Sequence, residues 1–322
     1  MTTRGRTVGR AEFDRLRDKH LSWGRWGPQD EVGALNKITP AHVARAASLV
    51  RTGEVLSLAM PLGQGPRNLL PPRFAPVFTM TRTGDDVRRA YDAGASGMQF
   101  TDDLLAMPLQ TGTHWDALAH VFHDGQMYNG RGPEAVPTAG AQRSSIAVAA
   151  DRMAGRGVLL DVPRLTGRAH LDIGEAIEAD DLEACVEGQH VEVGEADFVL
   201  IRTGRLGLAQ ADGEWGSEWA GGPSCGIEVS AIDWLCSRDI AAVAADTFSV
   251  EIIPAQTSAV GERAPMHSIL LAGAGIYVGE FWALDDLAAH CARTGSWEFL
   301  LTAPPLVVPG AVGSACNPLA IT

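Results

Sequence analysis

Apolar and polar positions change pattern several times along the chain, and each pattern predicts a different element. Strict alternation, and the short apolar runs further along, predict strands over 54–62, 77–83, 157–162, 197–202, 240–245, 276–280 and 297–308. Further helices are expected over 179–187, 230–237 and 283–291. A helix that ends near Gly53 is predicted to begin at Thr39-Pro40, because threonine is a good N-cap and proline suits the first helical position.

Strands outnumber helices in this prediction, which favours a mixed α/β fold in which a substantial sheet or barrel-like β core is covered by a few helices. Residues 63–75 and 84–100 are rich in Gly, Pro, Arg and Asp, so they are predicted to be long loops within one domain. Residues 1–39 are polar and turn-rich and predict an N-terminal arm, followed by a single catalytic domain over 40–322.

Composition narrows the classes of function. The net charge of −13 and the lack of a Lys/Arg run argue against binding of nucleic acid, because no basic stretch could follow a phosphate backbone. No apolar run reaches about 18 residues and the first residues lack a secretory core, so we expect no membrane span and a cytoplasmic location. The five cysteines are widely spread without a C-x-x-C pair, which indicates reduced, packed thiols.

The chemistry is concentrated in Gln110–His123, which reads QTGTHWDALAHVFH and holds three imidazoles and one carboxylate within its last ten residues. His114 and Asp116 are two residues apart, so in a strand both side chains point to one face and could share a cation. His120 returns to that face if the chain turns after Asp116. Imidazole nitrogen with carboxylate oxygen suits Zn²⁺ or Mn²⁺.

The alternative for this pair is structural: a hydrogen-bonded core histidine at His114 and a helix cap at Asp116. A second polar island weighs against that alternative, because His267 and Glu280 interrupt otherwise apolar stretches. A buried carboxylate after Ile276-Tyr277-Val278 needs a partner, and a metal ion is a good one. A surface strand end is the competing explanation for Glu280.

The segment Gln110–His120 resembles the signature H-x-G-T-H-x-D-x-x-x-H of the cyclase-like metal hydrolases, which include bacterial kynurenine formamidase and isatin hydrolase. It matches at every signature position except the first, where Gln110 stands. The resemblance extends over nearly the whole chain, through Trp26–Asn36, Ala245-Asp246-Thr247 with Met266-His267, and Gly313-Ser314 with Asn317-Pro318.

This resemblance implies a divalent metal, zinc or manganese, with His114 and Asp116 as ligands and with His267 and Glu280 completing the site or forming a second one. It implies that His120 is the catalytic acid/base. Gln110 offers a neutral amide oxygen at a ligand position, which Mn²⁺ or Mg²⁺ accepts more readily than zinc does. The implied reaction is attack of a metal-activated water on the amide, lactam, ester or lactone carbonyl of a small, cyclic or aromatic substrate.

Three other functions compete with this one. Gly222–Gly226 matches the G-x-S-x-G elbow of serine hydrolases, with Ser224 or Cys225 as nucleophile, but a polar, glycine-rich stretch precedes it where a buried strand is required. Gly273, Gly275 and Gly279 miss the spacing G-x-G-x-x-G of dinucleotide-binding sites by one residue. They also run into a predicted strand where that motif requires a helix, which argues against a nicotinamide cofactor. The third alternative is an inactive binding or scaffold protein, since the first ligand histidine is replaced by Gln110.

Two further expectations concern partners. Trp115 is expected to line the pocket of the small-molecule substrate, whose identity the residues leave open among formamides, lactams, lactones and carbamates. The chain is expected to form a homo-oligomer, a dimer or tetramer, through the N-terminal arm, because exposed aromatic residues such as Trp23 and Trp26 indicate a docking surface.

Overall fold

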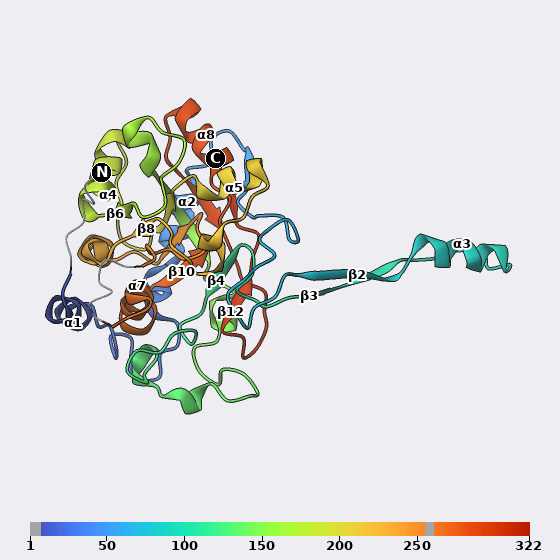
Figure 1. The fold of residues 1–322 in the computed structure, drawn as a ribbon, viewed down its shortest axis with the longest axis horizontal. Coiled ribbons are helices and arrows are strands. Elements are labelled where there is room, and N and C mark those ends of the chain that lie inside the picture. The colour runs from blue at the N-terminus through green and yellow to red at the C-terminus, as the bar shows by residue number, and fades with distance from the viewer. Residues whose placement is uncertain (1–7, 255–260) are drawn as a thin grey trace.

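A computed structural model describes residues 8–254 and 261–322 and contains one large sheet. In the described residues this mixed sheet has nine strands in the order β1-β13-β11-β5-β7-β9-β10-β4-β12 (Figure 1). Its strands are β1 (Val55–Ser57), β4 (His114–Asp116), β5 (Ala154–Asp161), β7 (Phe198–Arg202), β9 (Ala242–Ala245), β10 (Tyr277–Glu280), β11 (Glu298–Thr302), β12 (Gly313–Ala315) and β13 (Leu319–Ile321).

The centre of the sheet is parallel and its flanks are antiparallel. β5, β7, β9 and β10 run parallel, and they are almost continuously apolar and buried, as parallel strands covered on both faces are. β4 pairs antiparallel with both β10 and β12 and is buried throughout. The expected mixed α/β fold with a substantial sheet is confirmed.

The helices are α1 (Arg10–Lys19), α2 (Pro40–Ala47), α3 (Gly84–Asp92), α4 (Ala179–Gln189), α5 (Arg205–Asp212), α6 (Ile232–Ser237), α7 (Pro265–His267) and α8 (Asp285–Thr294). α2 begins as expected, because the Thr39 side chain accepts a hydrogen bond from the backbone N–H of His42. α2 packs against β5 and β11, and α4 packs against β5. A buried π-helical segment, Ser268–Ala274, continues directly from α7.

Several predicted boundaries were wrong. The expected strand over 297–308 ends at Thr302, and Leu306–Val308 form an exposed apolar segment before β12. The expected loop over 84–100 contains α3, whose start is closed by a reciprocal capping box between Thr83 and Asp86. Residues 8–39, the described part of the predicted N-terminal arm, contain α1, whose Phe13 and Leu16 are buried in the main core.

Two short sheets complete the structure. β6 (Ala176–Ile177) pairs with β8 (Gly226–Ile227), and β2 (Val77–Arg82) pairs with β3 (Asp102–Ala106). The β2–α3–β3 segment, residues 77–106, projects far from the rest of the molecule (Figure 1), and we refer to it as the hairpin arm. Within the described ranges, no helix is long and apolar enough to cross a membrane.

Candidate metal centre

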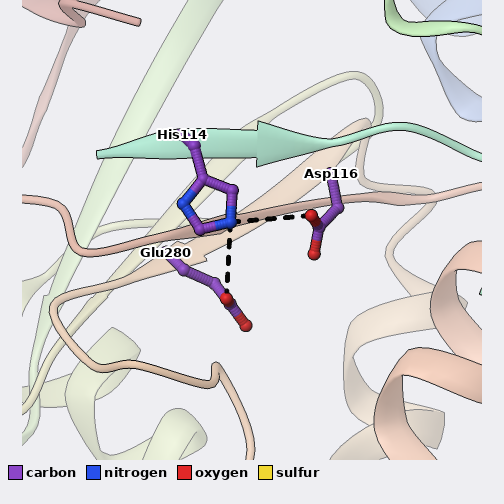
Figure 2. A group of neighbouring side chains, drawn as sticks. All are labelled: His114, Asp116 and Glu280. Carbon is purple, nitrogen blue, oxygen red and sulfur yellow. Dashed lines mark ion pairs between the residues drawn. The ribbon is translucent and has the colours of Figure 1, made fainter. Parts of the chain in front are cut away.

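Strand β4 presents His114 and Asp116 on one face of the sheet. Side chains alternate along a strand, so residues two apart point the same way. The His114 Nε2 atom lies 3.5 Å from Asp116 Oδ1, and both side chains are buried. Figure 2 shows the imidazole turned toward the carboxylate. The shared face that the sequence predicted is therefore present.

Glu280 reaches the same point from β10. It is directly opposite His114 in the antiparallel β4–β10 register, and its Oε2 lies 3.5 Å from His114 Nε2 (Figure 2). One ligand atom from each of His114, Asp116 and Glu280 lies within 4.8 Å of the other two. Two segments separated by more than 160 residues thus form one buried cluster, which is the arrangement that a metal site requires.

His267 faces the other side of this cluster. Its Nε2 lies 3.1 Å from Glu280 Oε1 and 3.7 Å from Asp116 Oδ2. The buried carboxylate of Glu251 holds the ring by accepting from His267 Nδ1 and from the backbone N–H groups of Met266 and His267. His114 is held in the same way, since its Nδ1 lies 2.8 Å from the carbonyl oxygen of Gly112. Fixing Nδ1 leaves Nε2 of each ring directed at the cluster, as in histidines that bind metal.

Glu251 was not predicted as a functional residue. Its signal was present in the sequence, because one carboxylate interrupts the apolar run Val250–Ile253, but nothing in the sequence showed that this residue contacts His267.

His120 lies at the accessible side of the cluster. The chain turns after β4, where the backbone N–H of His120 donates to the carbonyl of Ala117 at 2.9 Å. This turn brings His120 Nε2 to 3.6 Å from Asp116 Oδ1, while 24% of the side chain stays exposed. His120 can therefore exchange protons with bound substrate or solvent, in contrast to the buried His114.

Gln110 lies on the same face beside Asp116. Gly313 of β12 pairs with Asp116, and a Cβ atom on Gly313 would come within 2.4 Å of Gln110 Nε2. Directly opposed residues of paired strands point to one face, so the amide occupies the space that a Gly313 side chain would fill. Its Nε2 atom is buried without a hydrogen-bond partner.

The structure does not support a substrate contact of Trp115. Strand alternation puts its side chain on the face opposite to His114 and Asp116, where it is fully buried. Its indole N–H donates to the carbonyl of Ala303 at 2.9 Å, and its ring packs edge-on against Trp282 with centroids 4.7 Å apart. Gly279 is required behind it, because a Cβ there would lie 2.8 Å from the Trp115 ring. Trp115 therefore supports β4 from the core.

The charges of the cluster compensate one another. Burial disfavours the charged forms of His114 and His267, but the neighbouring carboxylates outweigh that effect and raise the pKa of both histidines, that of His267 strongly. Burial would raise the pKa of Asp116, yet the adjacent His120 and His114 lower it well below its usual range. Burial lowers the pKa of His120, so this ring is the one best suited to be neutral near pH 7.

A divalent cation fits these residues. His114 Nε2 and Asp116 Oδ1 are buried polar atoms without a hydrogen-bond partner, although they face each other across the cluster. Orphaned buried polar atoms are costly unless a ligand satisfies them. A cation between imidazole nitrogen and carboxylate oxygens would satisfy both, and this donor set suits Zn²⁺ or Mn²⁺.

Aromatic side chains lie between the cluster and a cavity of about 10 Å³, which is room for a single water-sized molecule. The Phe281 ring is 6.3 Å from the His114 ring and also packs on Trp219 and Phe248, which line the cavity. Arg73 stacks on Phe248 at 5.7 Å and donates to the carbonyl of Gln110 at 3.2 Å.

Ser224 and Cys225 also line this cavity, but Ser224 follows the short 3₁₀ helix Ser217–Ala220 rather than the strand that a nucleophile elbow needs. The Cys225 thiol has a pKa raised to about 12 by burial, so it is not a nucleophile at neutral pH.

Comparison with known proteins agrees with this geometry. The family model described as putative cyclase matches residues 40–252. A crystal structure described as a novel cyclase is 37% identical, with a TM-score of 0.86 over 95% of this chain and 99% of that chain. The chain belongs to the putative cyclase family.

More distant members of the fold include isatin hydrolase A from Labrenzia aggregata, 22% identical with a TM-score of 0.59 over 85% of this chain and 94% of that chain. A potential metal-dependent hydrolase with cyclase activity is 19% identical, with a TM-score of 0.52 over 83% of this chain and 96% of that one. No curated protein sequence matches this cyclase-family chain.

Proposed function

We propose that this cyclase-family protein is a metal-dependent hydrolase that cleaves an amide, lactam, ester or lactone bond of a small, flat substrate. One observation carries the proposal: His114 Nε2 and Asp116 Oδ1 are buried without partners and converge with Glu280 on one point. The related structures described as isatin hydrolase, one with the product analogue thioisatinate bound, and as a potential metal-dependent hydrolase support the same class of reaction.

In this proposal His114, Asp116 and Glu280 hold the cation, and His267 completes this site or a second one together with Asp116 and Glu280. Gln110 stands beside them as a neutral ligand. A bound zinc or manganese ion supplies a Lewis acid that polarises a carbonyl and lowers the pKa of water from about 15.7 towards 7. Glu251 and the Gly112 carbonyl keep the two imidazoles in their binding orientation.

His120 is proposed to move the proton. Its ring is partly exposed and its pKa is lowered, so at neutral pH it can accept a proton at Nε2 and deliver it to the leaving group. Asp116, 3.6 Å away, orients the ring and stabilises its protonated form.

The surroundings favour a neutral aromatic or cyclic substrate. Phe281 lies beside His114 with Phe248 and Trp219 packed against it, and the nearby guanidinium of Arg205 is neutralised by Glu218 at 2.7 Å. Arg73 is the nearby cation that could orient a carbonyl oxygen, since it stacks on Phe248 and lowers the pKa of His120. The cytoplasmic location expected from the sequence remains part of this proposal.

The test is metal analysis of the purified chain together with hydrolysis of a panel of formamides, lactams, esters and lactones, with and without chelator. We expect one or two Zn²⁺ or Mn²⁺ ions per chain and chelator-sensitive hydrolysis, both lost in His114→Ala. His290→Ala is the matched control, because His290 is an equally buried histidine that pairs with Glu54 in another part of the fold.

A chain that binds no metal, or that hydrolyses equally well after chelation, would contradict the proposal. A well-folded chain that binds neither metal nor substrate would favour the scaffold alternative raised by Gln110.

A further inference from the structure

The β4–β10 ladder ends at His114 and Glu280, two residues of the metal centre. They form its last pair, and the next pair would be Thr113 with Phe281. Phe281 does not continue the strand, because its φ of +58° lies in the left-handed region that residues other than glycine rarely adopt. The two segments therefore lose their backbone pairing directly beside the side chains that must converge.

The hydroxyl of Thr113 joins the two segments instead. It donates to the carbonyl oxygen of Phe281 at 2.5 Å and accepts from the backbone N–H of Met60 at 2.8 Å. Thr113 is 2% exposed, so both hydrogen bonds are shielded from water. The backbone N–H of Phe281 donates to the carbonyl oxygen of Thr247 at 2.9 Å. Both backbone polar groups of Phe281 are thus held, as a strained conformation requires.

We propose that Thr113 is a positioning residue that sets the separation of His114 and Glu280 for the cation. Thr113 directly precedes one of these ligands, and Phe281 directly follows the other. The two hydrogen bonds of the hydroxyl are made to backbone groups, so Thr113 acts on the ligands through the chain that carries them. This inference rests on the proposed function, because it concerns the same metal centre.

The positions of the two strand ends decide where the donor atoms lie. His114 Nδ1 is fixed by the Gly112 carbonyl, and Glu280 Oε1 accepts from the backbone N–H of Val250 at 3.3 Å. The two side chains are therefore restrained, and His114 Nε2 and Glu280 Oε2 lie 3.5 Å apart (Figure 2). Bonds from Zn²⁺ to such atoms are about 2.0–2.2 Å long and vary by about 0.2 Å. A small shift of either strand end should therefore weaken metal binding.

Threonine suits this role for two reasons. A hydroxyl can donate and accept at the same time, and the β-branched side chain restricts χ1, which keeps the oxygen in place. A second tie between the same segments, from the Trp282 indole N–H to the His114 carbonyl oxygen, is longer at 3.3 Å. Valine has nearly the shape of threonine but makes neither hydrogen bond, whereas serine keeps the hydroxyl. These two substitutions separate the hydrogen bonds from the packing.

The test compares Thr113→Val and Thr113→Ser in the full chain. Metal affinity is measured by titrating the metal-free protein with Zn²⁺ against a competing chelator, and coordination geometry by the visible absorption of the Co²⁺-loaded protein. We expect Thr113→Val to bind Zn²⁺ about 10- to 100-fold more weakly, the range for losing a supporting partner outside the ligands, and to show a shifted Co²⁺ spectrum. Thr113→Ser should keep the affinity and the spectrum close to wild type.

Thr203→Val is the matched control. Thr203 is also buried, and its hydroxyl bridges two groups in the same way, since it donates to Asp246 Oδ1 at 2.7 Å and accepts from the backbone N–H of Arg205 at 3.3 Å. Neither bond involves β4 or β10. The Thr203→Val variant should be less stable than wild type in urea unfolding and should retain wild-type metal affinity.

The outcomes separate this inference from the proposed function. Wild-type affinity in Thr113→Val, a loss in Thr113→Ser as large as in Thr113→Val, or an equal loss in Thr203→Val overturns the inference alone. A wild-type chain that binds no metal overturns the proposed function and the inference with it. If Thr113→Val does not fold, Thr113→Cys replaces it, because a thiol is a weak donor and acceptor. Lowered affinity then supports the inference, and wild-type affinity overturns it.

Discussion

Replacing Glu251 by glutamine tests whether the metal centre depends on a residue that does not belong to the predicted ligand set. The Glu251 carboxylate is 1% exposed and accepts three N–H groups, two from the backbone of Met266 and His267 and one from His267 Nδ1. Glutamine keeps one acceptor oxygen and turns an NH₂ group toward these donors. Even where the amide oxygen still accepts from His267 Nδ1, the imidazole loses the charged partner that directs its Nε2 at Asp116 and Glu280.

The expected magnitude follows from these contacts. Losing the outer partner of a metal-binding histidine typically lowers metal affinity about 10- to 100-fold, which is about 1.4–2.7 kcal/mol. Leaving a buried donor unsatisfied costs about 1–3 kcal/mol of folding free energy in addition. Affinity is measured by titrating the metal-free protein with Zn²⁺ or Mn²⁺ against a competing chelator, and stability by urea unfolding in excess chelator.

Asp197→Asn is the matched control. Asp197 is equally buried and pairs with Arg156 at 2.5 Å. It precedes β7, whereas Glu280 ends the parallel strand β10, so the two residues lie at opposite ends of the parallel strands. The Asp197→Asn variant should be less stable than wild type and should retain wild-type metal affinity. Wild-type affinity in Glu251→Gln, or an equal loss of affinity in the control, would refute the reasoning.

Four further outcomes are expected. His120→Ala should lower turnover about 10²-fold or more while leaving metal content nearly unchanged, whereas equal loss of metal and activity would make His120 a ligand. Gln110→His should tighten zinc binding in a competition titration, and unchanged affinity would place Gln110 outside the ligand set. Protonated His114 and His267 stabilise the fold, because folding raises the pKa of both above the unfolded value of about 6.5. This stabilisation is complete below about pH 6.5 and is lost as pH rises through the folded values, so the Tm of the chelated protein should fall above about pH 6.5, and bound metal should remove this fall. A Tm of the chelated protein that rises with pH would contradict the prediction. Gly279→Ala should destabilise by about 1–3 kcal/mol in urea unfolding, because the new Cβ meets Ala244 Cβ at 2.7 Å and the Trp115 ring at 2.8 Å, and an unchanged midpoint would mean that the core can yield there.

Local pattern determined much of this protein from the sequence alone. The Thr39-Pro40 helix start, the apolar strands β5, β7, β9 and β10, and the one-face placement of His114 and Asp116 all follow from rules that act over a few residues. The motif over Gln110–His120 was by itself enough to indicate the family. Helix α3, which was not predicted, also carried a local signal, since Thr83-x-x-Asp86 is a capping box.

Tertiary structure decided which side chains meet in the metal cluster, because this depends on pairing between segments that are distant in the sequence. Only the β4–β10 register places Glu280 opposite His114, and only the packing of α7 brings Glu251 to His267. Alternation also assigned Trp115 to the core once the sheet faces were known, which the sequence could not foresee because β4 is buried on both faces. The sequence thus determined which chemical groups are available and their local directions, whereas long-range strand pairing, which no short window encodes, decided which of them meet.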